Sequence, residues 1–431
     1  MPTQTTLRFR VEMQDTHLRG MGRAGGEEMM RSGALLGLVL VLATGCVHAP
    51  QSTPLVAGPQ VPGSLASAEL IRKDSATFLR FVQWWVEVPE PAEIDYGMRS
   101  YRLEYWTTNF DGQVVKASGL VSLPKGDAPL RGVVSYQHGT SSNREDSPSS
   151  KGLGEGALIS AIFAGGGYVL VAADYIGLGT NHGVHPYMHA ATTASTSIDL
   201  LRAAKTFVES QEKRWPGELY LVGFSQGGHA TLAVQRALEA APVERMHVVS
   251  STPIAGPVDL PGISFPVALE GKSTSHTFYL AYVACAYSAI YGQPVTTLLA
   301  EPYASSLPGL FDGDHGDADF AAALPKTPRE LFTPEFLDAF DHGKSHWFLD
   351  ALQENSLLDW KPAAPIRLYF GDKDLDVSPR EAQLAFDTFS KAGCNVTLVP
   401  VGPYAHDESV MYAIPLVRKH FDNLSLDRAA R

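Results

Sequence analysis

The sequence has no cluster of lysine and arginine. Its 431 residues include 34 Lys and Arg against 46 Asp and Glu, which gives a formal net charge of −12 at pH 7. Proteins that bind nucleic acid need clustered positive charge to neutralise phosphates, so this charge pattern argues against a nucleic-acid partner. The 45% of hydrophobic and 19% of charged residues are ordinary for a globular protein and argue against wholesale disorder.

The N-terminal apolar run is too short to span a membrane. It covers residues 34–42, follows the basic Arg31 and leads to small residues before Cys46. A basic start, a short apolar stretch and small residues at the end are the pattern of a secretory signal. Because such a signal starts near its basic residue, we expect translation to begin at Met29 or Met30, with residues 1–28 a start-site artefact.

The end of this segment, Thr44-Gly45-Cys46, resembles the processing box of bacterial lipoproteins, although Ala43 stands where leucine is usual. The resemblance implies that residues 1–46 comprise the start-site extension and the signal, with Cys46 lipidated as the mature N-terminus. The protein is then expected in the bacterial cell envelope, held at a membrane by its lipid anchor. The alternative is a plain secretory signal and a secreted protein.

Cysteine is scarce, with three residues in the chain. If Cys46 carries lipid, Cys285 and Cys394 permit one disulfide or none. They fall in segments that we place in different subdomains, so we expect two free, partly buried thiols.

The remaining chain changes character several times. Residues 47–65 are rich in Pro, Gly and Ser and are predicted to be a tether. From Ala66, apolar residues three and four apart predict a helix. Two strand-like runs then flank Asp111-Gly112, a strong hairpin signal.

Short, nearly continuous apolar runs follow, separated by helical patterns. Such runs are typical of parallel strands buried on both faces, so we predict an α/β fold: a mostly parallel central sheet with helices on both faces. The gap between the fourth and fifth of these runs is too long for one crossover and looks helical and aromatic. The predicted core is therefore residues 66–256 and 363–431, and the predicted helical cap or lid is residues 257–362.

Three candidate catalytic residues fall at the ends of predicted strands, where ligands collect in parallel α/β sheets. Ser225 stands at the centre of Gly223-Phe-Ser-Gln-Gly227, between a strand and a helix. A turn this tight admits only small neighbours and exposes the serine, whereas the pattern alone also fits an ordinary glycine turn. His406 follows the last strand, and the unperturbed pKa of histidine lies near neutral pH, which suits a general base.

The carboxylate that would orient His406 is predicted in the segment GDKDLDVSP. It offers three aspartates, and such a cluster is more often a solvated turn. The order along the chain is serine, aspartate, histidine.

In this order and placement, residues 95–423 resemble the α/β-hydrolase family, and most of all secretory lipases and related bacterial esterases. The resemblance implies that Ser225 is the nucleophile and that Asp374 is the acid. Ser378 stands where the family's proline is usual, so Asp376 remains an alternative. The segment YQHGT resembles the family's oxyanion loop, which implies that the backbone N–H groups of Thr140 and Gln226 hold the oxyanion.

Other histidines and aspartates suggest competing sites. His229 is near Ser225 in sequence, but it lies one helical turn past the serine and points poorly for a base. The spacing of His182, His185 and His189 could suit zinc, although Pro186 interrupts any helix that would align them. An acidic loop suggests calcium but fails the EF-hand pattern; its aspartates are Asp312, Asp314, Asp317 and Asp319.

The sequence thus predicts a serine carboxylesterase or lipase that acts on a small-molecule ester or lipid, with no metal and no cofactor. An aromatic cap over the serine favours an apolar acyl or aryl group over a sugar or phosphate. Two alternatives are a serine peptidase or amidase on the same fold and a non-catalytic ligand-binding envelope lipoprotein. The sequence leaves the oligomeric state open.

Overall fold

The structure is a computed structural model that describes residues 52–53 and 60–429. The predicted signal and the lipidation site at Cys46 therefore lie outside the described residues. Among the helices described, none is long and apolar enough to cross a membrane.

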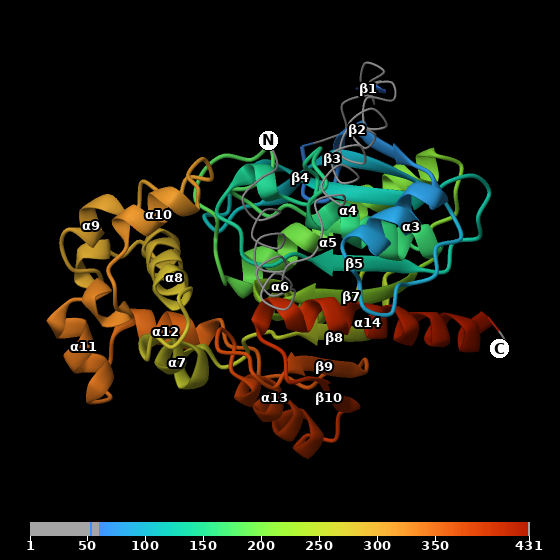
Figure 1. Cartoon of the computed structure of the whole chain (residues 1–431). Helices are drawn as coiled ribbons and strands as arrows, with labels where there is room; N and C mark the ends of the chain where they lie inside the picture. The colour runs from blue at the N-terminus through green and yellow to red at the C-terminus, as the bar shows by residue number, and fades with distance from the viewer. Residues whose placement is uncertain (1–51, 54–59, 430–431) are drawn as a thin grey trace, which may run out of the picture. The chain divides into compact units, whose positions relative to one another are not determined.

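A ten-stranded sheet forms the core, in the spatial order β1-β2-β3-β4-β6-β5-β7-β8-β9-β10 (Figure 1). The first four strands are antiparallel and the six from β6 to β10 are parallel. The strands are β1 (Ser52–Thr53), β2 (Leu65–Asp74), β3 (Met98–Thr108), β4 (Val114–Pro124), β5 (Val133–Gln137), β6 (Val169–Ala173), β7 (Glu218–Phe224), β8 (His247–Ile254), β9 (Ile366–Gly371) and β10 (Val396–Gly402). The predicted α/β fold with a mostly parallel sheet is confirmed.

Helices cover both faces of the parallel strands. Alternate residues of a strand point to opposite faces, and in β6 Val169 and Val171 join one hydrophobic cluster while Leu170 and Ala172 join another. The first cluster includes residues of α5, α6 and α13, and the second includes residues of α4 and α14. With α3, the helices of the core are α3 (Ala76–Trp85), α4 (Glu155–Phe163), α5 (Ala190–Ser210), α6 (Gln226–Ala240), α13 (Pro379–Lys391) and α14 (His406–Ala429).

The N-terminal edge of the sheet corrects two predictions. The helix predicted from Ala66 is the strand β2 up to Asp74, and α3 begins only at Ala76. Part of the predicted tether is also sheet, because β1 pairs with β2. Pairing with β3, whose first residue Met98 lies opposite Asp74, decides the conformation of this segment, and local periodicity does not contain that information.

Between β8 and β9 the chain forms helices and loops, apart from one isolated bridge between Leu299 and Phe332. This helical insert has its own hydrophobic cluster, to which Tyr187 and Met188 of the core also belong. Its helices are α7 (Phe265–Leu269), α8 (His276–Ile290), α9 (Tyr303–Ser306), α10 (Asp317–Ala323), α11 (Pro334–Asp341) and α12 (Trp347–Glu354). Cys285 lies on α8, and both Cys285 and Cys394 are free.

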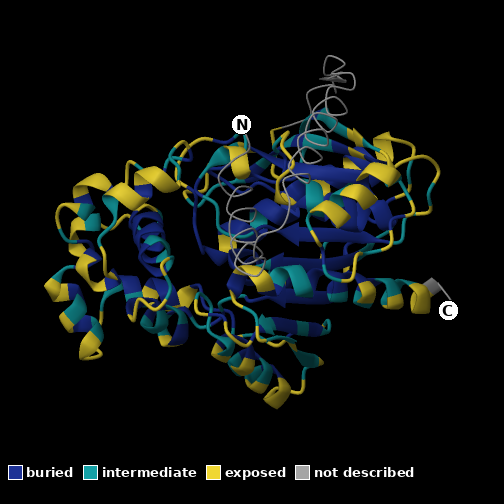
Figure 2. Cartoon of the chain, viewed as in Figure 1, coloured by how far each residue is buried: buried dark blue, intermediate teal, exposed yellow. Residues whose placement is uncertain are grey.

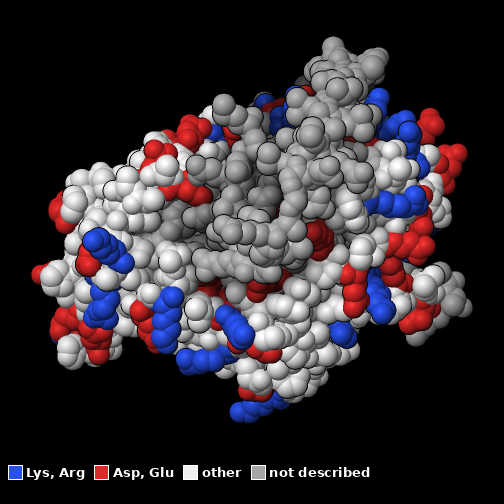
Figure 3. Space-filling view, in the orientation of Figure 1, with Lys and Arg blue, Asp and Glu red and all other residues white. Residues whose placement is uncertain are grey.

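Positive and negative side chains are interspersed on one face of the molecule. On the face seen in Figure 3, Lys and Arg stand beside Asp and Glu across the described residues.

Candidate active site

A single residue, Ser225, joins β7 to α6. Its backbone has φ 59° and ψ −120°, a conformation that costs a non-glycine residue about 1–3 kcal/mol. The adjacent glycines make the turn possible: a Cβ on Gly223 would lie 2.2 Å from the carbonyl oxygen of Gly227. A Cβ on Gly227 would in turn lie 1.9 Å from the carbonyl oxygen of Gln137 on β5. The turn at Ser225 therefore requires glycine at both positions, because a side chain at either would collide with the backbone.

The structure brings Ser225, His406 and Asp374 into one hydrogen-bonded row. The Nε2 atom of His406, the first residue of α14, lies 2.9 Å from Ser225 Oγ. Its Nδ1 atom lies 2.7 Å from Asp374 Oδ2, in the loop after β9. The three residues are only 6%, 5% and 4% exposed, so these bonds form in surroundings of low polarity.

Asp374 and Asp376 have different positions relative to His406. The Oδ1 atom of Asp374 accepts hydrogen bonds of 2.9 Å from the backbone N–H groups of Asp376 and Val377, which fixes the carboxylate toward the imidazole. Among the described residues, the buried Oδ1 atom of Asp376 has no hydrogen-bond partner. The charge of Asp376 raises the pKa of His406.

The charges around His406 favour its protonated form. Burial alone lowers the pKa of the imidazole, but the hydrogen bond with Asp374 and the charges of Asp374, Asp376 and Asp407 outweigh it. The net effect is a pKa above the ordinary value. A histidine held in this way can take up a proton and stabilise the charge it acquires.

Two segments of backbone border Ser225. Gln226 is the first residue of α6, so its N–H has no acceptor within the helix. A Cβ on Gly139 would lie 4.0 Å from the Cβ of Ser225, so the loop that precedes Thr140 lies against the nucleophile candidate. The Thr140 hydroxyl lies 3.0 Å from the hydroxyl of Tyr187. Gln226 thus directly follows the serine, and Thr140 directly follows the loop residue that lies against it.

His185 holds the side chain of Gln226 in place, a role that the sequence did not reveal. Its Nδ1 atom is 2.8 Å from the carbonyl oxygen of Ile176, so Nδ1 carries the proton. Burial lowers the pKa of His185 to about 3. The imidazole is therefore neutral, and its Nε2 atom accepts a hydrogen bond of 2.8 Å from Gln226 Nε2.

The other residues of the zinc hypothesis do not converge with His185. The Nδ1 atom of His189 is 2.7 Å from the hydroxyl of Thr192. Within the described part of the chain, no group of three or more His, Cys, Asp and Glu side chains could hold a metal ion. In the acidic loop of the calcium hypothesis, Asp314 is paired with Arg144.

His229 faces away from the serine hydroxyl. Its Nε2 atom is 2.8 Å from the carbonyl oxygen of Asn355, at the end of α12. Burial lowers the pKa of His229 to about 4, so the ring is neutral and donates to that carbonyl. The histidine nearest to Ser225 in sequence therefore connects the core to the helical insert.

One helix of the insert, α8, reaches three loops around the site. His276 Nε2 donates to the carbonyl oxygen of Leu375, beside Asp374 (2.8 Å). The Tyr282 hydroxyl donates to Ser141 O (3.1 Å), and the Tyr287 hydroxyl donates to Met188 O (3.0 Å). The sequence placed aromatic residues above the serine, but it gave no signal for these individual contacts.

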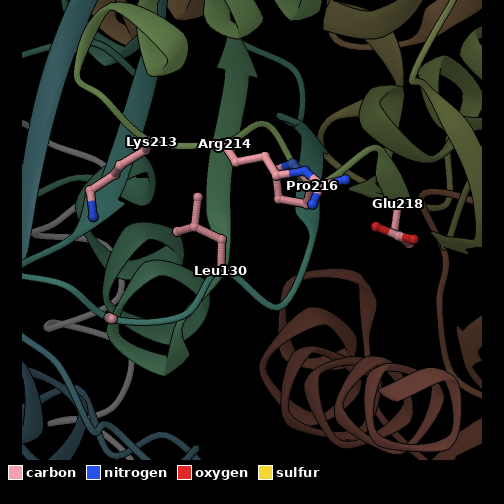
Figure 4. Close-up of a pocket in the computed structure, with 6 residues that line it drawn as sticks. Leu130, Lys213, Arg214, Pro216 and Glu218 are labelled. Atoms are coloured by element: carbon pink, nitrogen blue, oxygen red, sulfur yellow. The ribbon is translucent and has the colours of Figure 1, made fainter. Parts of the chain in front are cut away.

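A surface hollow of about 490 Å³ lies away from Ser225, His406 and Asp374. Leu130, Lys213, Arg214, Pro216 and Glu218 line it, and Lys213 and Glu218 stand at opposite ends of it (Figure 4). Glu218 is the first residue of β7, whereas Ser225 follows its last residue. The hollow is therefore at the amino ends of the parallel strands, and it shares no residue with the site around Ser225.

The sheet, the turn at Ser225 and the comparisons with solved structures define the class: the chain has the α/β-hydrolase fold and is similar to hydrolases and esterases of known structure. A hydrolase from Legionella pneumophila is 27% identical with a TM-score of 0.78, over 84% of this chain and 98% of that one. The rice cell wall degrading esterase LipA from Xanthomonas oryzae is 26% identical with a TM-score of 0.73, over 86% and 98%.

Candida antarctica lipase A is 16% identical with a TM-score of 0.61, over 84% of this chain and 83% of that one, which is a likeness of fold alone. No protein-family model matches the chain. No curated protein sequence matches it either.

Proposed function

We propose that the chain is a serine hydrolase that cleaves carboxylic esters through an acyl-enzyme. The observation that carries the proposal is the row Ser225–His406–Asp374, with 2.9 Å between Ser225 Oγ and His406 Nε2 and 2.7 Å between His406 Nδ1 and Asp374 Oδ2. Acyl transfer needs a nucleophile that is hydrogen-bonded to a base, and a base that is hydrogen-bonded to an orienting carboxylate.

In the first half-reaction, Ser225 Oγ attacks the ester carbonyl carbon and His406 Nε2 takes the hydroxyl proton. The C–O bond to the alcohol then breaks, and the leaving alkoxide receives that proton from His406. Asp374 remains ionised and stabilises the imidazolium. In the second half-reaction His406 takes a proton from water, the resulting hydroxide attacks the acyl-enzyme, and the acid leaves as Ser225 recovers its proton.

The negative charge on the carbonyl oxygen needs donors that are already in place. The backbone N–H groups of Gln226 and Thr140 are proposed for this role. The first is a free N–H at a helix N-terminus, and the second belongs to the loop against Ser225. One such donor contributes on the order of 10²–10³-fold to kcat in acyl-transfer enzymes.

The proposed substrate is a small-molecule ester or a lipid with an apolar acyl or aryl group. Support comes from aromatic side chains beside the site, where the rings of Tyr187 and Tyr282 stack with centroids 4.3 Å apart.

For location, we propose that the Cys46 signal anchors the protein by lipid to the bacterial cell envelope, with secretion as the alternative. Mass spectrometry of the mature N-terminus tests this, because an unmodified Cys46 there would exclude the anchor.

Hydrolysis of matched p-nitrophenyl esters and p-nitroanilides tests the proposed reaction. We expect ester hydrolysis by the wild type and a loss of kcat of at least about 10⁴-fold in Ser225→Ala and in His406→Ala. Ser195→Ala, a serine on α5 outside the site, is the matched control and should retain full activity. A steep preference for the anilides would favour a peptidase or amidase. A folded wild type without activity on either class would favour a non-catalytic binding protein.

A further inference from the structure

The helix α3 carries four exposed aromatic side chains that the proposed hydrolase function does not use. They are Phe78, Phe81, Trp84 and Trp85, and among the described residues no other Phe or Trp is classed as exposed. The two tryptophans are 67% and 49% exposed. Figure 2 shows the exposed positions along α3. An apolar surface of this kind on a soluble domain marks a contact with something else.

The four aromatic side chains form a stripe, the aromatic stripe of α3, on a separate face of the helix. At 100° per residue, the four aromatic side chains fall within an arc of roughly 120°. The opposite face holds the buried Leu79 and Gln83, and Leu79 packs in a hydrophobic cluster with Ile94 and Met98. The fold therefore already buries the face of α3 that it needs, and the aromatic face is additional.

The charge on α3 is minimal. Its sequence, ATFLRFVQWW, contains one charged residue, Arg80, whose guanidinium donates to the carbonyl oxygen of Ile94. Tryptophan and phenylalanine with few charges are the residues that enter the boundary between lipid headgroups and acyl chains.

The size of the stripe argues against a second copy of this chain. From the exposed fractions, the four side chains present roughly 400 Å² of aromatic surface. A stable protein–protein interface needs about 800 Å² from each partner. A surface of half that area on one helix is suited to shallow insertion into a bilayer that already holds the chain by another anchor. The chain supplies a candidate anchor, since the lipoprotein-type cysteine Cys46 precedes Trp84 by 38 residues.

We infer that the aromatic stripe of α3 docks on a phospholipid bilayer. The strand registers give the orientation that follows. Asp74, just before α3, pairs with Met98, and Met98 pairs with Pro124 at the end of β4. That end of β4 extends past the amino end of β6, because Ser122 already pairs with Leu170.

The aromatic stripe is thus at the amino ends of the parallel strands, and Ser225 is at their carboxyl ends. The seven residues of β7 span about 23 Å between these two ends of the sheet. The bound protein then presents Ser225 and His406 away from the bilayer. This inference does not rest on the proposed reaction.

Quenching of tryptophan fluorescence by brominated phosphatidylcholine vesicles tests the docking on the full chain. The first tryptophan in the sequence is Trp84, so an N-terminal segment that binds lipid cannot itself give a quenching signal. We expect quenching in the wild type and none in Trp84→Ser/Trp85→Ser. The variant Phe78→Ser/Phe81→Ser keeps both reporters and should need at least tenfold more lipid for half-maximal quenching.

The matched control is Leu426→Ser, which removes a 62%-exposed leucine on α14 and should quench like the wild type. Unchanged hydrolysis of a soluble ester, or unchanged circular dichroism if the protein is inactive, shows that each variant is folded. An unquenched wild type, or a phenylalanine variant that quenches at wild-type lipid concentration, would overturn the inference. Concentration-dependent dimers that the Trp84→Ser/Trp85→Ser change abolishes would overturn it in favour of a second copy.

Discussion

Replacing Asp374 with asparagine should inactivate the site without disturbing its shape. The carboxylate Oδ1 atom accepts two backbone hydrogen bonds of 2.9 Å, from Asp376 and Val377, and Oδ2 faces His406 Nδ1 at 2.7 Å. An asparagine keeps its oxygen toward the two N–H donors, because the reverse orientation leaves buried donors unpaired at about 1–3 kcal/mol each. Its NH₂ group then faces His406 Nδ1.

Two donors cannot share that contact, so the proton of His406 moves from Nδ1 to Nε2. The Nε2 atom then donates to Ser225 Oγ and can no longer take its proton. In a serine protease the equivalent change lowers kcat about 10⁴-fold, which corresponds to roughly 5.5 kcal/mol of barrier. We expect a loss of about 10³–10⁴-fold in kcat for Asp374→Asn.

The assay is kcat and kcat/KM for a soluble p-nitrophenyl ester as a function of pH, with the unfolding temperature as the check on folding. Asp376→Asn is the matched control, since this carboxylate influences His406 through its charge, and its loss should stay within about tenfold. A larger loss for Asp376→Asn than for Asp374→Asn would refute the reasoning. So would an Asp374→Asn enzyme that retains more than a tenth of wild-type kcat.

Three further predictions follow from the titrating groups. Because the pKa of His406 is raised, kcat/KM should rise with pH to a plateau with its midpoint above about 6.5, and Asp376→Asn should move that midpoint to lower pH in the same titration. His229→Gln should keep kcat within about threefold of wild type while lowering the unfolding temperature, since this buried histidine holds the helical insert; a loss comparable to His406→Ala would contradict this. Burial raises the pKa of Glu381 to about 7, so its native form binds a proton that the unfolded chain releases near pH 4.5. The contribution of Glu381 to the free energy of unfolding is therefore lost as pH rises from about 4.5 to 7. Chemical denaturation should show that the free energy of unfolding falls over this pH range by about 3 kcal/mol less in Glu381→Gln than in the wild type.

The sequence predicted the parallel sheet because buried strands leave a strong signal, short apolar runs that end in small or polar residues. It also predicted the sites at strand ends, and the structure places Ser225 and His406, 181 residues apart, within hydrogen-bond distance. Between Asp374 and Asp376 the sequence was less decisive. Their difference depends on which carboxylate the loop after β9 turns toward α14, and spacing along the chain does not encode that direction.

Other features could not be predicted because distant partners decide them. Residues 65–74 have the apolar spacing of a helix, yet pairing with β3 makes them a strand. The hydrogen bond from Tyr282 to Ser141 joins residues 141 positions apart and depends on how the insert folds back. His185 is neutral because it is buried, and its hydrogen bond to the carbonyl oxygen of Ile176 leaves Nε2 free to accept from Gln226.

The proposed reaction requires that Ser225 is a nucleophile activated by His406. Mass spectrometry of the protein after reaction with a fluorophosphonate tests it most directly. We expect one covalent adduct, on the peptide that contains Ser225, formed rapidly by the wild type and at least 10³-fold more slowly by His406→Ala. A folded wild-type protein that stays unlabelled, or an adduct on a different residue with Ser225 unmodified, would contradict it.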